Sequence, residues 1–486
     1  MTGIRGFRRA KGIRLLTNDQ LDSIHEASLR IMGKSGVRFD SENARKHLLS
    51  AGCTAHPDRK DVIRFPRSVV NDAVKKIPRH PTFYARDPAW DVKYDGETMF
   101  PYSGGGDPKM VDLETGVVRP ATLEDVEAAA RLGDALGNSC YASSLVVPNE
   151  VPAEILGIKI AEAAVKNSVK AVTGYAPNPE AVDFIVKMLE CVSGGEEEFR
   201  RRPLITLSGS PSSPLTYSRH VSDVLIRSLE LGVPYTVVPC PVAGGSGPQS
   251  LAGSLALQNA ELLAGIVLMQ AVNGNLATVY AGRVCLMDPR SGRDLWAIPE
   301  QGLASIAMIQ LAGKYGMVAD ACGMTSEMPT WGMQMGLERM ETVLLPALGG
   351  AESVSGIGGG WEGASCLEMM VVDNEILNDV ERLMRGIQVD EEHLALDVID
   401  KVGPMGNFLA QPHTMNHLRK GEMRISDFWD KRTGEKLRGE GTHDIRDEAR
   451  VRTRKLLKDH VPEPLDRDVL GDMGVVVRKA AKVLVR

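Results

Sequence analysis

Between residues 143 and 360, short β-rich runs alternate with amphipathic helical segments. Seven runs can be distinguished, at residues 143–148, 170–175, 204–211, 235–241, 277–283, 317–323 and 352–360. Strand–helix alternation predicts a parallel sheet with right-handed crossovers. Units at this spacing predict an α/β protein with a TIM (β/α)₈ barrel, whose eighth strand the pattern leaves unassigned. Because periodicity does not prove that the sheet closes, a doubly wound open sheet stays as the alternative.

Stretches of different character flank the barrel segment. Thr17 and Gln20 form a capping-box pattern at a helix start. Residues 98–122 contain two short extended pieces separated by glycines and an ETG turn. We therefore expect an N-terminal helical and β-hairpin cap over 1–138, the barrel over 139–400, and a C-terminal helical extension over 401–486 packed on the barrel.

Composition excludes several classes of function. The 57 Lys and Arg against 63 Asp and Glu give a net charge of −6, which argues against broad nucleic-acid binding. No apolar run reaches the roughly 20 uninterrupted residues of a membrane span, and the first residues lack the apolar core of a secretory signal. Seven scattered cysteines without a C-x-x-C pair fit reduced thiols. We expect a cytoplasmic protein whose partners are small molecules or other proteins.

Familiar catalytic motifs are absent or incomplete. The chain has no P-loop and no G-x-S-x-G elbow. In SGIGGGW, Trp361 stands where a dinucleotide-binding loop needs its third glycine. Lys170 lies at the start of its strand, which disfavours a Schiff-base lysine at a strand's C-terminal end. His413 and His417 stand four residues apart without an adjacent Glu or a nearby third ligand, so no metal site is expected.

Candidate site residues lie where the strands end. Several strands run into glycine, proline or serine, as in LSGSP, PCPVAGGSG and GIGGG, and the C-terminal ends of barrel strands form the functional face. In residues 241–270 a glycine-rich turn precedes a long apolar helix that carries Ser254, Gln258 and Glu261 on one stripe. The turn is suited to binding a ligand with the stripe supporting it, or the stripe forms hydrogen bonds only within the barrel.

The chain resembles the trimethylamine methyltransferase superfamily from about Leu15 to its last helix. Four segments carry the resemblance: VPYTVVPCPVAGGSGPQSLAGSLALQNAELLAGIVL, MDPRSGRDLWAIPE, LEMMVVDNEILNDVERLMRGIQVDEEHLALDVIDKVGPMGNFLAQPHTMNHLR and VPEPLDRDV. The resemblance implies a TIM barrel that moves a methyl group from a methylamine to the cobalt of a corrinoid (cobalamin), usually on a small partner protein, within a family tied to methanogenesis. The archaeal trimethylamine enzymes contain pyrrolysine, which this chain lacks. It is therefore similar to the non-pyrrolysine branch, which includes glycine betaine methyltransferases.

A quaternary amine suits this branch chemically, because its nitrogen leaves as a neutral tertiary amine without a proton donor. Such an enzyme needs positioning more than acid–base groups, and no catalytic residue is assigned. Aromatic faces bind a trimethylammonium group, so Tyr102 and Trp361 are candidates, with Glu300 and Glu362 for electrostatic support. The turn at Gly244, Gly245, Ser246 and Gly247 would hold a betaine carboxylate or a polar edge of the corrinoid.

One segment departs from the pattern of related chains. TSEMPTWGMQMGLE keeps Gln334, but Pro329 and Gly332 stand at a lysine and an acidic position, and Trp331 is introduced beside them. We add Trp331 and Gln334 to the substrate-binding candidates. We predict corrinoid-dependent methyl transfer from glycine betaine or a related betaine. The alternatives are demethylation of another methylamine and a non-catalytic betaine-binding barrel, and the oligomeric state, a homo-oligomer included, stays open.

Overall fold

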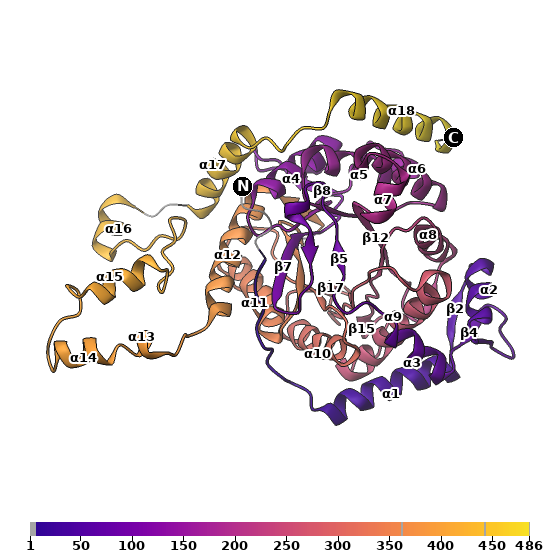
Figure 1. Ribbon diagram of the computed structural model, residues 1–486, viewed down its shortest axis with the longest axis horizontal. Helices are drawn as coiled ribbons and strands as arrows, with labels where there is room; N and C mark the ends of the chain where they lie inside the picture. Colours follow the sequence, from indigo (N-terminus) through magenta and orange to yellow (C-terminus); the bar gives the residue numbers. More distant parts are fainter. Residues whose placement is uncertain (1–5, 361–362, 442–443, 486) are drawn as a thin grey trace.

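The computed structural model describes residues 6–360, 363–441 and 444–485. Its centre is a parallel barrel surrounded by helices (Figure 1). The barrel strands are β7 (Thr98–Ser103), β10 (Tyr141–Ser143), β11 (Ala171–Gly174), β12 (Ile205–Gly209), β14 (Tyr235–Val237), β18 (Asp320–Cys322) and β19 (Ser353–Ile357). Between β14 and β18, the backbone at Tyr280 fills the eighth position through a parallel bridge to Ala319.

Hydrogen bonds close the barrel all the way round. β10, β11, β12 and β14 pair in parallel in that order, as do β18, β19 and β7. The Cys140 N–H donates to the Pro101 carbonyl at 2.8 Å, which joins β10 to β7. The Arg283 N–H donates to the Pro239 carbonyl at 2.9 Å, which joins the Tyr280 segment to the end of β14. The predicted TIM barrel is confirmed, and the doubly wound open sheet is wrong.

The strand that the sequence pattern leaves unassigned is β7. It lies inside residues 1–138, the predicted cap, so the barrel sheet begins at Thr98 and not after residue 138. The sequence suggests a hairpin there because glycines separate β7 from the short strand β8 (Lys109–Val111). β8 pairs instead with β9 (Val118–Pro120) and β20 (Ala364–Cys366), beyond the end of the barrel.

Helices that follow the strands form the outer ring. They are α4 (Leu123–Ala135), α5 (Leu156–Asn167), α6 (Pro179–Ser193), α7 (Glu196–Arg201), α8 (Arg219–Glu230), α9 (Leu251–Asn273), α10 (Pro299–Tyr315), α11 (Met333–Gly349) and α12 (Leu367–Arg385). Local signals set their ends: a capping box between Thr122 and Asp125 begins α4. Asn178 caps α6, which ends at Gly194 in the left-handed conformation.

Helix α9 is the long apolar helix that follows the glycine-rich turn. Within the described residues it alone is long and apolar enough to cross a bilayer, but 83% of its most apolar window is buried inside the protein. It packs against α8 and against the N-terminal helices α1 (Asn18–Lys34), α2 (Glu42–Ser50) and α3 (Arg67–Lys75). Packing against these four helices therefore explains why α9 is apolar.

The N-terminal segment also closes the bottom of the barrel. Strands β5 (Thr82–Phe83) and β6 (Val92–Lys93) form a hairpin whose Phe83 joins Tyr94 and Tyr141 in a separate apolar cluster. The remaining short elements are β1 (Phe7–Arg8), β2 (Val37–Phe39), β3 (Thr54–Ala55), β4 (Val62–Arg64), η1 (Pro88–Trp90), η2 (Ala153–Ile155), β13 (Thr216–Tyr217), β15 (Val242–Ala243), β16 (Cys285–Met287) and β17 (Asp294–Leu295).

The C-terminal extension divides into two parts. Helix α17 (Ile445–Asp459) packs on α12 and α4, and α18 (Arg467–Leu484) packs on α6. The helices α13 (Glu391–Leu394), α14 (Leu396–Val402), α15 (Pro412–Arg419) and α16 (Gly434–Glu440) instead project away from the barrel (Figure 1). The extension thus packs on the barrel through its last two helices, because the projecting segment has almost no buried side chains to contribute.

Candidate functional site

A cavity of about 820 Å³ opens at the C-terminal ends of the barrel strands, and we call it the mouth cavity. Residues at or just beyond the end of each of the eight strand positions line it: Tyr102, Ser143, Thr173, Ser208, Val238, Arg283, Cys322 and Ser355. A smaller space of about 80 Å³, the inner cavity, lies deeper and shares Tyr102, Thr173 and Arg283 with it. A site built from every strand end is the usual position of function in this fold.

An ion pair forms the floor between the two cavities. The Arg283 Nη2 lies 2.6 Å from the Asp320 Oδ2, with side-chain exposures of 8% and 5%. Asp320 also accepts hydrogen bonds from the Ser353 hydroxyl at 2.6 Å and from the Tyr102 hydroxyl at 3.1 Å. Three donors therefore converge on this one buried carboxylate. Burial is the largest single influence on the pKa of the Arg283 guanidinium and lowers it, but the surrounding groups, Asp320 first among them, together raise this pKa above its ordinary value.

Aromatic rings stand beside this pair. The rings of Tyr102 and Tyr141 meet edge to face with centroids 5.2 Å apart. The hydroxyls of Tyr141 and Tyr94 are 3.0 Å apart. Burial raises the pKa of Tyr102 well above its ordinary value, and the neighbouring Asp320 adds to the effect, so the phenol stays neutral. The floor therefore presents neutral aromatic surface next to balanced charges.

The rim of the mouth cavity carries further carboxylates and a tryptophan. The Trp296 indole N–H donates to Asp294 at 2.8 Å. The Ala297 N–H donates to Glu327 at 2.9 Å, and Arg293 lies 3.6 Å from the same carboxylate. Trp296, Asp294, Glu327 and Arg293 all line the cavity. These groups give the rim a polar, predominantly acidic edge around an indole.

Asp107 is a second carboxyl group on the cavity wall. It accepts hydrogen bonds from the Ser365 hydroxyl at 2.7 Å and from the Gly360 N–H at 3.3 Å. Burial raises its pKa above the ordinary aspartate value, against the effect of these two bonds. A lining carboxyl with a raised pKa is a candidate proton donor.

Glycines allow the strand ends to crowd around the mouth. At Gly356, φ is +131°, and a Cβ would come within 1.9 Å of the Gly323 carbonyl oxygen. The parallel pairing of β19 with β7 shifts register between Ser355 and Ile357, on either side of this glycine. The SGIGGG segment thus serves close backbone packing at the barrel rim.

The structure brings few of the predicted residues to this cavity. Tyr102 lines it. Glu300 lies in the exposed first turn of α10, outside the lining. Trp331 lines a different cavity, of about 530 Å³, between α11, α12 and α17. Gln334 is exposed and donates to Glu338 at 2.7 Å.

The other predicted positions are Trp361, Glu362 and the glycine turn. Trp361 and Glu362 fall outside the described residues. The Gly244 N–H donates to the Gly247 carbonyl at 2.9 Å, and the Ser246 hydroxyl accepts from the Val242 N–H at 3.0 Å. The turn at Gly244, Gly245, Ser246 and Gly247 contributes no described residue to the lining of the mouth cavity, so its corrinoid role stays a prediction.

The polar stripe on α9 forms hydrogen bonds inside the protein. The Ser254 hydroxyl donates to the Pro248 carbonyl at 2.6 Å, and the Gln258 amide donates to the Tyr280 hydroxyl at 3.4 Å. Glu261 accepts from the Ser213 hydroxyl and the Leu215 N–H, each at 2.8 Å. Of the two interpretations of this stripe, the hydrogen-bonding one accounts for these contacts.

Sequence reasoning missed the residues at the centre of the cavity. Asp320 and Arg283 are single charged residues within or at the end of the apolar runs MVADACG and ATVYAGR. A charge in such a run is a usable signal, because buried charges are rare without a partner. Trp296 lies in the segment DLWAIPE, four residues before Glu300.

The closed parallel barrel, with its cavity lined from every strand, defines a TIM-barrel enzyme. Comparison with known proteins narrows this class. A family model described as trimethylamine methyltransferase (MTTB) matches residues 4–482. The glycine betaine methyltransferase of Desulfitobacterium hafniense is 30% identical over 96% of this chain and 97% of that protein. The trimethylamine methyltransferase MttB of Methanosarcina thermophila is 31% identical over 97% of this chain and 98% of that protein.

Solved structures agree on the fold. The Methanosarcina barkeri monomethylamine methyltransferase (MtmB) superposes with a TM-score of 0.50 at 11% identity, over 92% of this chain and 95% of that one. The chain belongs to the trimethylamine methyltransferase family and is a methyltransferase. The resemblance drawn from its sequence motifs is confirmed.

Proposed function

We propose that this enzyme transfers a methyl group from a quaternary amine, glycine betaine or a related betaine, to the Co(I) of a corrinoid carried by a partner protein. The observation that carries the proposal is the floor of the mouth cavity, where aromatic rings stand beside a charge-balanced Arg283–Asp320 pair. Aromatic faces attract a trimethylammonium group, with about 0.5–2 kcal/mol for each contact. Asp320 contributes the carboxylate of the ion pair beside these rings.

The two ends of a betaine have different requirements that the cavity can meet. The carboxylate needs donors, which Arg283 and the strand-end hydroxyls of Thr173 and Ser208 supply. The ammonium needs aromatic and anionic surface, which Tyr102 supplies at the floor and Trp296 and Glu327 supply at the rim. This orientation turns the carboxylate toward Arg283 and one methyl group outward.

The methyl acceptor approaches from the open side of the mouth. Five of the lining residues are glycines: Gly104, Gly105, Gly356, Gly360 and Gly363. Among the described residues, none would lie within 4 Å of a Cβ at Gly363. Backbone without side chains lets a flat macrocycle come close to the opening, which fits a corrinoid as the second substrate.

The reaction balances without an acid. The electron pair of Co(I) forms the bond to the methyl carbon, and the pair of the carbon–nitrogen bond stays on nitrogen. Glycine betaine would leave as dimethylglycine, a neutral tertiary amine at the reacting nitrogen. The protein's contribution is to hold the ammonium, align one methyl group and exclude water, and alignment alone lowers a barrier by several kcal/mol.

Asp107 supports a second candidate within the same family. A tertiary amine must be protonated or otherwise activated before its nitrogen can leave, and the raised pKa of Asp107 would suit a proton donor. Under this alternative the substrate would be a tertiary methylamine, and Asp107 would be essential.

A methyl-transfer assay tests the proposal. Reduced cobalamin is mixed with the pure protein and separately with glycine betaine, carnitine, choline and trimethylamine, and the conversion of Co(I) to methyl-Co(III) is followed by its absorbance. We expect conversion with glycine betaine or a close betaine. Conversion only with trimethylamine would favour the second candidate. Binding of a betaine without conversion of any donor would indicate a binding protein.

All seven cysteines are free thiols, which suits the proposed cytoplasmic location and assays under reducing conditions.

A further inference from the structure

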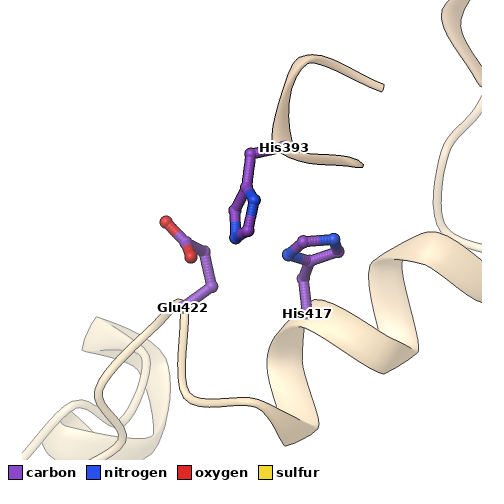
Figure 2. Close-up of side chains that lie close together, drawn as sticks. All are labelled: His393, His417 and Glu422. Carbon is purple, nitrogen blue, oxygen red and sulfur yellow. The ribbon is translucent and has the colours of Figure 1, made fainter. Parts of the chain in front are cut away.

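Two histidines and a carboxylate converge in the segment that projects from the barrel. We call residues 387–425, with α13, α14 and α15, the arm. His393 at the end of α13, His417 in α15 and Glu422 after α15 each offer a ligand atom, and these atoms all lie within 4.8 Å of one another. Figure 2 shows the two imidazole rings close together, with the Glu422 side chain beside them. His413 and His417 suggest no metal site in the sequence, because the further ligands come from distant positions.

The hydrogen bonds around His393 orient it as metal-binding histidines are oriented. Its Nδ1 lies 2.6 Å from the Asp390 carboxylate, which leaves Nε2 for the centre of the cluster. A carboxylate on the far nitrogen fixes the ring and raises its basicity as a ligand.

A second observation concerns how the arm is held together. Throughout residues 387–425, all of which the structure describes, His417 is the only buried side chain, at 8% exposure. The large apolar side chains of the arm are exposed: Ile387, Val389, Leu394, Leu396, Ile399, Met405, Phe408, Leu409, Met415, Leu418, Met423 and Ile425. The arm also contains no cysteine. Segments of this size without an apolar core are usually held by a metal, a disulfide or a partner.

We propose that His393, His417 and Glu422 bind a divalent transition metal of the zinc type, and that this ion fastens α13 to α15. Two imidazoles and one carboxylate suit zinc or cobalt better than magnesium or calcium. At zinc–nitrogen distances of about 2.0–2.1 Å, the ligand atoms of a tetrahedron lie about 3.4 Å apart. Small side-chain movements therefore complete the site.

A fourth ligand and two competing cations are also in place. The Glu392 Oε1 lies 3.7 Å from the His417 Nε2 and could fill the fourth position, as could water. Lys420 pairs with Glu392, and Arg382 lies 3.5 Å from Glu422. These cations hold the carboxylates near the centre, and the metal would displace Arg382 from Glu422.

Cobalt binding tests the site directly, because tetrahedral Co²⁺ with nitrogen and oxygen ligands absorbs strongly in the visible range. The full-length protein is treated with a chelator, dialysed and titrated with Co²⁺, then with Zn²⁺ in competition. We expect one equivalent with a tetrahedral spectrum that Zn²⁺ abolishes. His417→Ala and Glu422→Gln should weaken binding at least tenfold, and Asp390→Asn should weaken it about 10–100-fold while keeping the spectrum. His220→Ala, an exposed histidine of α8, is the matched control and should bind like the unchanged protein.

Limited trypsin digestion gives a readout that does not depend on spectra. Exposed Lys401 and Arg419 lie in the arm, and bound Zn²⁺ should slow their cleavage severalfold in the unchanged protein but not in His417→Ala. The thermal transition of the barrel should be the same in all variants, which shows that they fold. Weak Co²⁺ binding that His417→Ala and Glu422→Gln leave unchanged, or cleavage that Zn²⁺ does not affect, would overturn the proposal.

Discussion

Arg283 and Asp320 lie 2.6 Å apart at the floor of the mouth cavity, each from a different barrel strand position and each almost fully buried. Neither charge has another ion partner of this geometry among the described residues. The pair fixes the electrostatic character of the site: the floor is polar and hydrogen-bonded but carries no net charge. Two consequences follow, one for stability and one for the substrate.

Replacing Asp320 should destabilise the protein strongly. Asp320→Asn leaves the buried Arg283 charge without its counter-charge, and breaking a buried pair on one side costs about 3–5 kcal/mol. Denaturant unfolding would measure the loss. Asp294→Asn, at the exposed end of β17, is the control and should change stability by less than about 0.5 kcal/mol. Equal stability of the two variants would contradict this account of the floor.

Tyr102 separates the role of its ring from that of its hydroxyl. Tyr102→Phe keeps the aromatic face and loses the hydrogen bond to Asp320, so the Kd for a betaine should change little. Tyr102→Leu removes the face and should weaken binding by about 1–2 kcal/mol, or roughly 5–30-fold. Calorimetric titration of both variants gives the two Kd values. An equal loss of betaine affinity in Tyr102→Phe and Tyr102→Leu would assign the effect to the hydroxyl.

Asp107 distinguishes quaternary from tertiary substrates. If the substrate is quaternary, Asp107→Asn should keep the methyl-transfer rate within a few-fold, because no proton is needed at the nitrogen. If Asp107 is a general acid, the rate should fall by about 10²–10⁴-fold. Single-turnover rates with saturating substrate measure this. Ser365→Ala, which removes one of the hydrogen bonds to Asp107, shows how much of any change comes from altered geometry.

Glu261 should make stability depend on pH. Burial raises its pKa to about 7, whereas the unfolded chain titrates near the ordinary value of about 4.3. At a pH between these two pKa values, Glu261 is therefore protonated in the folded state and ionised in the unfolded state. The resulting contribution, about 3–4 kcal/mol, is fully present below pH ~4 and is lost as the pH rises through about 7.

Glu261→Gln tests this contribution, because glutamine is neutral at every pH. The difference in unfolding free energy between the variant and the unchanged protein should vary over pH 5–8, with the unchanged protein losing stability relative to the variant as the pH rises. Glu42→Gln, on the surface, is the control. A pH-independent difference for Glu261→Gln would contradict the raised pKa.

The sequence predicts the barrel because strand–helix alternation is a local pattern that survives in every unit from β10 to β19. It does not predict β7, because the pairing of that strand with β19 joins residues about 250 positions apart, and local signals there resemble a hairpin. Tyr102 is among the predicted site residues, since it stands at a strand end beside glycines. Trp331 lies just before α11 and Gln334 lies in its first turn, and neither lines the mouth cavity, because the packing of α11 sets both positions.

The projecting arm shows the same limit. His413 and His417 are visible as an i, i+4 pair, but His393 and Glu422 join His417 only through the path of the chain between α13 and α15.

Lys170, in contrast, behaves as its position in the sequence predicts. Its ammonium donates to three backbone carbonyls, of Gly133, Leu136 and Ser139, at 2.7–2.9 Å. It is a structural lysine in this fold.

The pH profile of a single methyl transfer shows whether the departing nitrogen needs a proton donor. The unchanged protein, saturated with glycine betaine, is mixed with reduced cobalamin at pH 6 to 9, and the rate of methyl-Co(III) formation is recorded. We expect conversion at a rate that stays flat across this range, because no acid donates to the departing nitrogen. A rate that falls with rising pH along a single protonation step, or turnover of trimethylamine with none of glycine betaine, would contradict it.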